Sequence, residues 1–164
     1  MRTVLRNRKG YCFATTGSIG VLGGTLNIGG GYRPLFRTVA APFINSKEFT
    51  IYMNRLKLPG VMFSQTFYKT PLGTPEHGIQ INVTDPTRFR PITTEIAILS
   101  YLKRRYPKQR LFRPEFYKSY DKAMGNSKTR ISLMNRASHV PVINRWTKDL
   151  QRYKQKRQKY LLYK

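Results

Sequence analysis

The sequence predicts an α+β fold: a small mixed sheet, several helices and a long amphipathic helix at the carboxy terminus. Two stretches, 61–68 and 79–84, have the β-branched and aromatic content of strands. Helical spacing of apolar residues or helix-capping signals are present in the stretches before and after these two strands. Because strands and helices follow one another in blocks instead of alternating, the order favours α+β over a parallel α/β sheet.

The chain has the size and composition of one compact domain. Its 164 residues are 40% hydrophobic, enough for an ordinary core. We expect a basic tail at 1–9 and a single α+β domain at 10–164. The one cysteine, Cys12, cannot form an internal disulfide and does not fix the compartment. No export signal is visible near the amino terminus, and no run of about 18 apolar residues predicts a membrane span.

The first elements are a glycine-rich region and a capped helix. Residues 10–33 combine many glycines with short apolar runs, which predicts strands and turns, with a flexible linker as the alternative. Asn45 followed by Glu48 is typical of a helix amino-terminal cap. A helix over 46–57 follows, and Pro59-Gly60 ends it.

The two predicted strands are joined by a loop and differ in pattern. Residues 61–68 are rich in β-branched and aromatic side chains, and 69–78 are expected to form a loop with three prolines or glycines at its turns. The second strand alternates strictly, so that one face is apolar and the other polar. The apolar face holds Ile79, Ile81 and Val83, and the polar face holds Gln80, Asn82 and Thr84.

The rest of the chain is predicted to be helical. A helix over 91–106 begins at a proline and ends before Pro107, and a short one over 114–124 ends at Gly125. Another helix is expected over 127–136. The last, over 140–160, places apolar residues on one face and Lys and Arg on others; the apolar positions are Ile143, Trp146, Leu150 and Tyr153.

The net charge of +24 is the strongest compositional signal. Thirty-one Lys and Arg face seven acids, which indicates attraction to a polyanion or an acidic surface. A basic nucleic-acid-binding or ribosome-associated protein is therefore one hypothesis. The basic residues are spread over most of the chain, however, and no RRM, KH or zinc-knuckle pattern is present.

Polar side chains gather around the second strand. His77, Gln80, Asn82, Thr84 and Asp85 lie in the predicted loop and on one strand face, where they could hydrogen-bond a sugar. The alternative is the solvent-facing side of a half-buried sheet, with Asp85-Pro86 as a turn. Two histidines and one cysteine predict no metal site. Among the seven acids, only Glu76 and Asp85 bracket this strand, and no residue is assigned as catalytic.

Several motifs, in order, resemble one known family. Residues 16–32 and 40–45 are similar to the "GTLSIGxGY…GAPWID" region of the NamZ-like exo-β-N-acetylmuramidases, and segments 58–63, 77–85 and 89–91 also resemble that family. Residues 146–150 and 157–163 resemble its closing "W…DL…F…R…YLLY". Each motif is weak alone, but their shared order from about residue 10 to the last residue is fairly specific.

The resemblance implies the carboxy-terminal auxiliary domain of a peptidoglycan glycoside hydrolase. The family removes terminal N-acetylmuramic acid from the non-reducing ends of peptidoglycan fragments without a cofactor, in the periplasm or outside the cell. Its catalytic residues would lie in a separate amino-terminal Rossmann-like domain, so this chain alone would be inactive. The cleft-facing residues implied here orient the sugar; they are His77, Gln80, Asn82, Thr84 and Asp85, with Tyr32 and Lys69 as weaker candidates. A structural domain with no ligand of its own is the remaining alternative.

Overall fold

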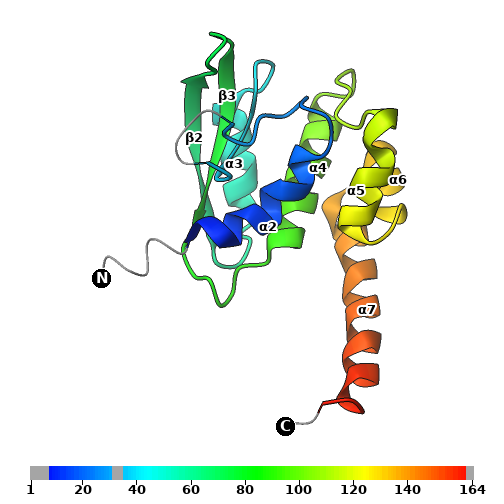
Figure 1. The fold of residues 1–164 in the computed structure, drawn as a ribbon. Coiled ribbons are helices and arrows are strands. Elements are labelled where there is room, and N and C mark those ends of the chain that lie inside the picture. Colours follow the sequence, from blue (N-terminus) through cyan, green and yellow to red (C-terminus); the bar gives the residue numbers. More distant parts are fainter. Residues whose placement is uncertain (1–7, 31–34, 162–164) are drawn as a thin grey trace.

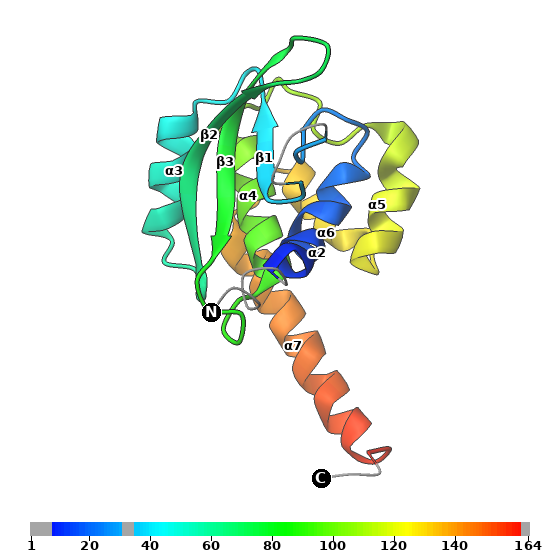
Figure 2. The same cartoon turned by 60° about the vertical axis from the view of Figure 1, so that its left-hand side comes forward.

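The computed structural model describes residues 8–30 and 35–161, and its architecture confirms the α+β class (Figures 1 and 2). A three-stranded sheet forms one side of the molecule and helices form the other. The elements in chain order are α2 (Arg8–Gly20), β1 (Thr38–Ala41), α3 (Ser46–Arg55), β2 (Val61–Lys69), β3 (Pro75–Val83), α4 (Pro91–Arg105), the 3₁₀ turn η1 (Pro114–Phe116), α5 (Tyr117–Met124), α6 (Lys128–Met134) and α7 (His139–Gln158).

The sheet is antiparallel throughout, in the order β1-β3-β2, so the expectation of a mixed sheet is wrong. β3 is the central strand, with Ile79 opposite Val39 on one side and Gln65 on the other. The short hairpin connection between β2 and β3 explains the antiparallel pairing, because parallel neighbours need a long crossover. α3 contacts β2 and β3, and α2 contacts β3.

The predicted helix over 46–57 is confirmed as α3, together with its cap. The side-chain oxygen of Asn45 accepts a hydrogen bond from the Glu48 amide at 3.0 Å, which satisfies one free N–H of the first turn. Its buried face consists of Phe49 and Met53. The chain then turns at Gly60, whose φ of 70° is a conformation that glycine adopts without strain.

The expectation of strands and turns over 10–33 is wrong at its start, because residues 8–20 form the helix α2. Cys12, Thr15, Thr16 and Ile19 are buried at helical spacing and form its inner face. Gly20 lets the helix end come close to the following segment, since a Cβ there would lie 2.8 Å from Ile28 Cδ1. The packing surface is therefore built largely from cysteine, threonine and glycine.

Half of the expected loop over 69–78 is also strand. β3 begins at Pro75, and only residues 70–74 lie between the two strands. The connection closes with the Thr70 amide donating to the Thr74 carbonyl at 2.9 Å. As a result, Glu76 and His77 have fixed places in the sheet, opposite Tyr68 and Phe67.

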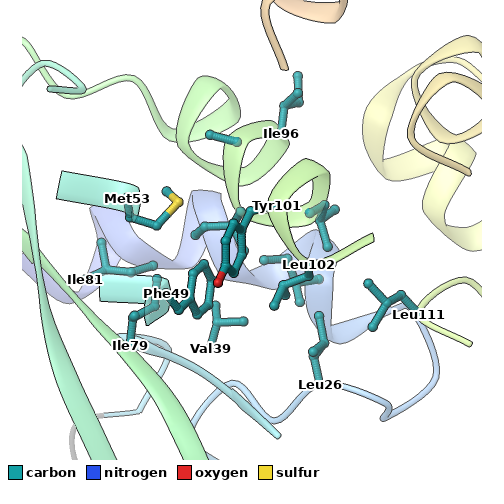
Figure 3. Close-up of a cluster of buried hydrophobic side chains, with 14 of the residues drawn as sticks. Leu26, Val39, Phe49, Met53, Ile79, Ile81, Ile96, Tyr101, Leu102 and Leu111 are labelled. Carbon is teal, nitrogen blue, oxygen red and sulfur yellow. The ribbon is translucent and has the colours of Figure 1, made fainter. Parts of the chain in front are cut away.

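The core lies between the sheet and α4 (Figure 3). Val39, Ile79 and Ile81 contribute from the sheet, and all three are fully buried. The rings of Phe49 and Tyr101 stack in parallel, with centroids 4.7 Å apart, and join α3 to α4. This packing holds the sheet rigidly against the helices, and the outer sheet face stays free of helices.

The four helices predicted after the sheet are all present. α4 packs against α2, α6 and α7, while α5 ends at Gly125 in the left-handed conformation, as expected. The long final helix is confirmed as α7, which leaves the body and projects beyond it (Figures 1 and 2). Among the described residues, no helix is long and apolar enough to cross a membrane.

Candidate functional site

The outer face of the sheet carries a ladder of polar side chains. Asn82 is its centre: its side-chain oxygen accepts hydrogen bonds from Gln80 Nε2 at 2.9 Å and from Arg37 Nη2 at 3.0 Å. The Asn82 amide nitrogen in turn donates to Ser64 Oγ at 2.9 Å. The predicted alternation of β3 is thus confirmed, since Gln80 and Asn82 point away from the buried Ile79 and Ile81.

Toward the hairpin, the same face holds a buried polar cluster around Asn27. The Asn27 side-chain oxygen accepts from the amides of Gly29 and Gly30, at 2.8 and 3.0 Å, and from the Tyr68 hydroxyl at 2.9 Å. Its backbone exchanges two hydrogen bonds with Ala40 on the edge of β1. Three hydrogen bonds to its side chain and two to its backbone therefore fix the position of Asn27.

Glu76 belongs to this cluster and has an unusual environment. Its side chain is 7% exposed, and its Oε2 atom has no hydrogen-bond partner among the described residues. Burial raises the pKa of the Glu76 carboxyl, and a hydrogen bond with the Asn27 side chain partly opposes this shift. Because Glu76 Oε2 is covered by the protein and has no partner among the described residues, this environment disfavours the charged carboxylate.

Two other buried polar atoms lie along this side of the sheet. Neither Thr38 Oγ1 nor Arg37 Nε has a hydrogen-bond partner in the part of the chain that the structure describes. Arg37 also forms no ion pair with a carboxylate in that part. We name this surface the polar sheet face; it consists of Asn27, Arg37, Ser64, Tyr68, Glu76, Gln80 and Asn82.

His77 does not share the polar sheet face, contrary to the expected grouping. It pairs with Phe67 and Ala41 on the opposite side of the sheet, because residues 77, 79 and 81 point the same way. Its ring lies 4.9 Å from that of Phe67, and both line a shallow hollow. Lys69 follows on the same side of β2 and is exposed. The hollow is lined by Ser46, Gln65, Thr66, Phe67 and His77.

Thr84 and Asp85 lie beyond the other end of β3. The Thr84 amide donates to the Gly60 carbonyl, and Asp85 Oδ1 accepts from the Thr87 amide and hydroxyl, at 2.9 and 2.7 Å. These hydrogen bonds, that of the Thr87 hydroxyl foremost, lower the pKa of Asp85. Asp85 therefore serves the turn that the sequence also suggested. Tyr32 lies outside the described residues.

The geometry separates the two carboxylates that bracket the strand. Glu76 and Asp85 are nine residues apart along an extended chain, which is about 30 Å at the usual rise per residue. Paired carboxyl groups of glycosidases lie within about 5 to 10 Å of each other. Three other acids are occupied in ion pairs with arginines: Glu48, Glu115 and Asp121. The described residues contain no group of three potential metal ligands.

Sequence reasoning missed five members of this surface: Asn27, Arg37, Ser64, Tyr68 and Glu76. For Glu76 a signal was available, because continuing the period of two backward from Gln80 places it on the polar side. The same count places His77 with Ile79. Asn27 and Arg37 reach the sheet only through tertiary contacts, which no local pattern reveals.

Comparison with known proteins agrees with the resemblance. Residues 12–163 match the model of the family "Exo-beta-N-acetylmuramidase NamZ, C-terminal". The chain is 35% identical over 150 residues to the peptidoglycan β-N-acetylmuramidase NamZ of Bacillus subtilis strain 168, covering 88% of this chain and 36% of that protein. The chain thus spans about a third of that relative's length.

A solved structure shares the fold. A DUF1343 family protein from Bacteroides fragilis NCTC 9343, determined at 1.65 Å, superimposes with a TM-score of 0.83 at 25% identity. The match covers 94% of this chain and 42% of that protein. None of these similarities supports the alternative of a basic nucleic-acid-binding protein. The chain belongs to the NamZ exo-β-N-acetylmuramidase family, in which it corresponds to the C-terminal domain.

Proposed function

We propose that this domain forms one wall of the glycan-binding cleft of an exo-β-N-acetylmuramidase that acts on peptidoglycan fragments. The observation that carries the proposal is the polar sheet face, where the half-buried side chains of Arg37, Gln80 and Asn82 are joined by hydrogen bonds to Asn82 Oδ1. The name of the Bacillus subtilis relative supplies the substrate class. The domain orients the sugar, and the bond-breaking carboxylates belong to another part of the enzyme.

The polar sheet face offers complementary groups for an amino sugar. The exposed Ser64 hydroxyl can donate to or accept from a sugar hydroxyl, and the amides of Gln80 and Asn82 can both donate and accept. Because Asn27 and Asn82 are already fixed by the network around them, little side-chain entropy is lost when a ligand binds.

Arg37 is the natural partner of the lactyl carboxylate of muramic acid. A charge-assisted hydrogen bond of this kind contributes about 1.5 to 3 kcal/mol. The net charge of +24 also draws an anionic glycan toward the domain from a distance. The net charge attracts a ligand without fixing its position. Arg37, held beside Asn82, would give the carboxylate one defined partner.

Calorimetric titration with N-acetylmuramic acid and with a disaccharide muropeptide tests this proposal. Arg37→Gln should weaken binding roughly ten- to hundredfold, the equivalent of one charge-assisted hydrogen bond. Arg152→Gln removes the same charge from an exposed position on α7 and should leave the affinity nearly unchanged. Thermal unfolding of both variants checks that the fold is retained.

Two results would count against the proposal. Equal losses in Arg37→Gln and Arg152→Gln would mean that the ligand responds only to overall charge. Failure of both saccharides to bind the wild-type chain, at concentrations up to tens of millimolar, would remove the polar sheet face as a sugar wall.

A further inference from the structure

The outer half of α7 has no partner in this domain. Every described residue from Thr147 to Leu161 is exposed, and the helix extends past the rest of the molecule in both views (Figures 1 and 2). Its inner half is anchored: Val142 is buried, and the Trp146 indole donates to Thr129 Oγ1 at 2.9 Å. A half-anchored helix of 20 residues needs another surface to hold its free part.

Some residues in the outer half of α7 lie on the same helix face as the buried residues of its inner half. Trp146, Leu150, Tyr153 and Arg157 follow at spacings of four, three and four, which keeps them within a narrow arc of the helix surface. Leu150 and Tyr153 are 51% and 59% exposed, large values for such side chains. We call these four residues the α7 stripe. The closing motif that resembles the NamZ family falls on these same positions.

A second copy of this chain is a poor occupant of the α7 stripe. The helix carries six Lys and Arg against one acid, Asp149, and four of the cations form a flank beside the stripe. Pairing two such helices would bring these like charges together at a cost. The flank consists of Arg145, Lys148, Arg152 and Lys156.

The relatives point to a different occupant. This chain corresponds to a C-terminal domain and spans only 36% and 42% of the two longer proteins that it matches. α2, where the described domain begins, starts at the lower side of the body, and α7 projects below that same side in both views. A portion that joins the domain at α2 would therefore enter on the lower side of the body, below which α7 projects.

We propose that the α7 stripe is the surface on which the preceding, catalytic portion of a NamZ-type enzyme docks. The inference rests on the proposed function for the identity of that portion. Burying Leu150 and Tyr153 there would fix α7, and with it the angle between the polar sheet face and the bond-breaking carboxylates. The basic flank would remain at the rim of the contact, where charges tune the rate of docking more than its strength.

A chimera tests the proposal: in the Bacillus subtilis relative, this chain replaces the part that it matches. Hydrogen–deuterium exchange is followed in 147–158, without any glycan, in the chimera and in the chain alone. We expect exchange of these amides to slow at least tenfold in the chimera. Leu150→Ser with Tyr153→Ser should restore fast exchange, whereas the matched control Arg152→Ser with Lys156→Ser should not. Unchanged exchange in β2 and β3 shows that each variant is folded.

Three outcomes would overturn the proposal. Exchange in α7 could be equally fast in the folded chimera and in the chain alone. Protection of the chain alone that grows with its concentration would assign the stripe to a second copy. Protection only on phosphatidylglycerol vesicles would assign it to a lipid surface. Because no saccharide is present, these results are independent of the sugar-binding test, and either proposal can fail alone.

Discussion

At the scale of single residues, the carboxyl group of Glu95 is fully buried among the helices. Glu95 on α4 is 0% exposed, its Oε1 accepts from the Tyr120 hydroxyl at 3.3 Å, and its Oε2 has no partner among the described residues. Burial raises the pKa of Glu95 to about 7, although the nearby Ser18 side chain and the Tyr120 hydroxyl oppose the shift. Glu95 falls within the helix predicted over 91–106, and nothing in the sequence indicated that it is buried.

We predict that Glu95→Gln removes part of the pH dependence of stability. The pKa in the folded state, about 7, lies above the ordinary value of 4.5. Between these values the unfolded chain releases a proton that the folded chain retains, so the free energy of unfolding falls as pH rises. The full loss, about 3 kcal/mol, is reached above pH 7. Urea unfolding at pH 4, 6 and 8 measures this fall.

The matched control for Glu95 is Glu115→Gln. The pKa of Glu115 is lowered, mainly by a hydrogen bond with its own backbone, and its side chain is exposed. This variant should keep the steep wild-type fall between pH 4 and pH 8, whereas Glu95→Gln should flatten it. Parallel curves for wild type and Glu95→Gln would show that Glu95 does not control the slope.

At the scale of elements, the sequence predicted best where one local signal was sufficient. The Asn45 cap, the alternation of β3 and the Gly125 stop each depend on neighbours within a few residues, and all three are confirmed. α2 was missed because its inner face contains Cys12, Thr15 and Thr16, which do not look apolar in a periodicity count. Tertiary packing, not local preference, makes this segment a helix.

The turn at Gly60, between α3 and β2, allows the cost of a left-handed backbone conformation and of a close contact to be measured. Gly60 has φ of 70°, and a Cβ there would lie 2.3 Å from the Asp85 carbonyl oxygen, which belongs to the turn after β3. Gly60→Ala should therefore cost about 3 kcal/mol or more, from an unfavourable φ and from displaced backbone. Chemical denaturation measures the loss.

Gly73 in the β2–β3 hairpin is the control for Gly60. Its φ of 81° is similar, but a Cβ there would meet nothing within 4 Å. Gly73→Ala should cost only about 1 to 2 kcal/mol, the penalty of the left-handed conformation itself. Equal losses at both positions would mean that the close contact between Gly60 and the β3 turn is unimportant.

At the scale of the whole molecule, the fold class and the family were predictable but the shape of the site was not. The alternation of β3 indicated Gln80 and Asn82, and these lie on the polar sheet face. Asn27 and Glu76 are 49 residues apart in the chain, and the bridge between Asn27 and Ala40 and the hydrogen bond from Tyr68 bring them together. Such contacts depend on the complete fold and leave no local pattern in the sequence.

The net charge leads to a prediction for the entire molecule. With 31 Lys and Arg against seven acids, repulsion among cations opposes the compact state. Three ion pairs occupy Glu48, Glu115 and Asp121, and the pairs of Glu48 and Glu115 are exposed, so the attraction that they supply is small. Most of the positive charge is therefore left without compensation by acids.

Added salt should consequently stabilise this protein. Between 20 and 300 mM NaCl the screening length shrinks from about 20 Å to below 10 Å, which weakens the long-range repulsion more than the close ion pairs. We expect Tm to rise by several degrees over this range, measured by calorimetry. Arg152→Glu with Lys156→Glu lowers the net charge by four and should reduce the rise, while Arg152→Lys with Lys156→Arg should not. A Tm that falls with salt would mean that ion pairs, and not repulsion, dominate the electrostatic free energy of this domain.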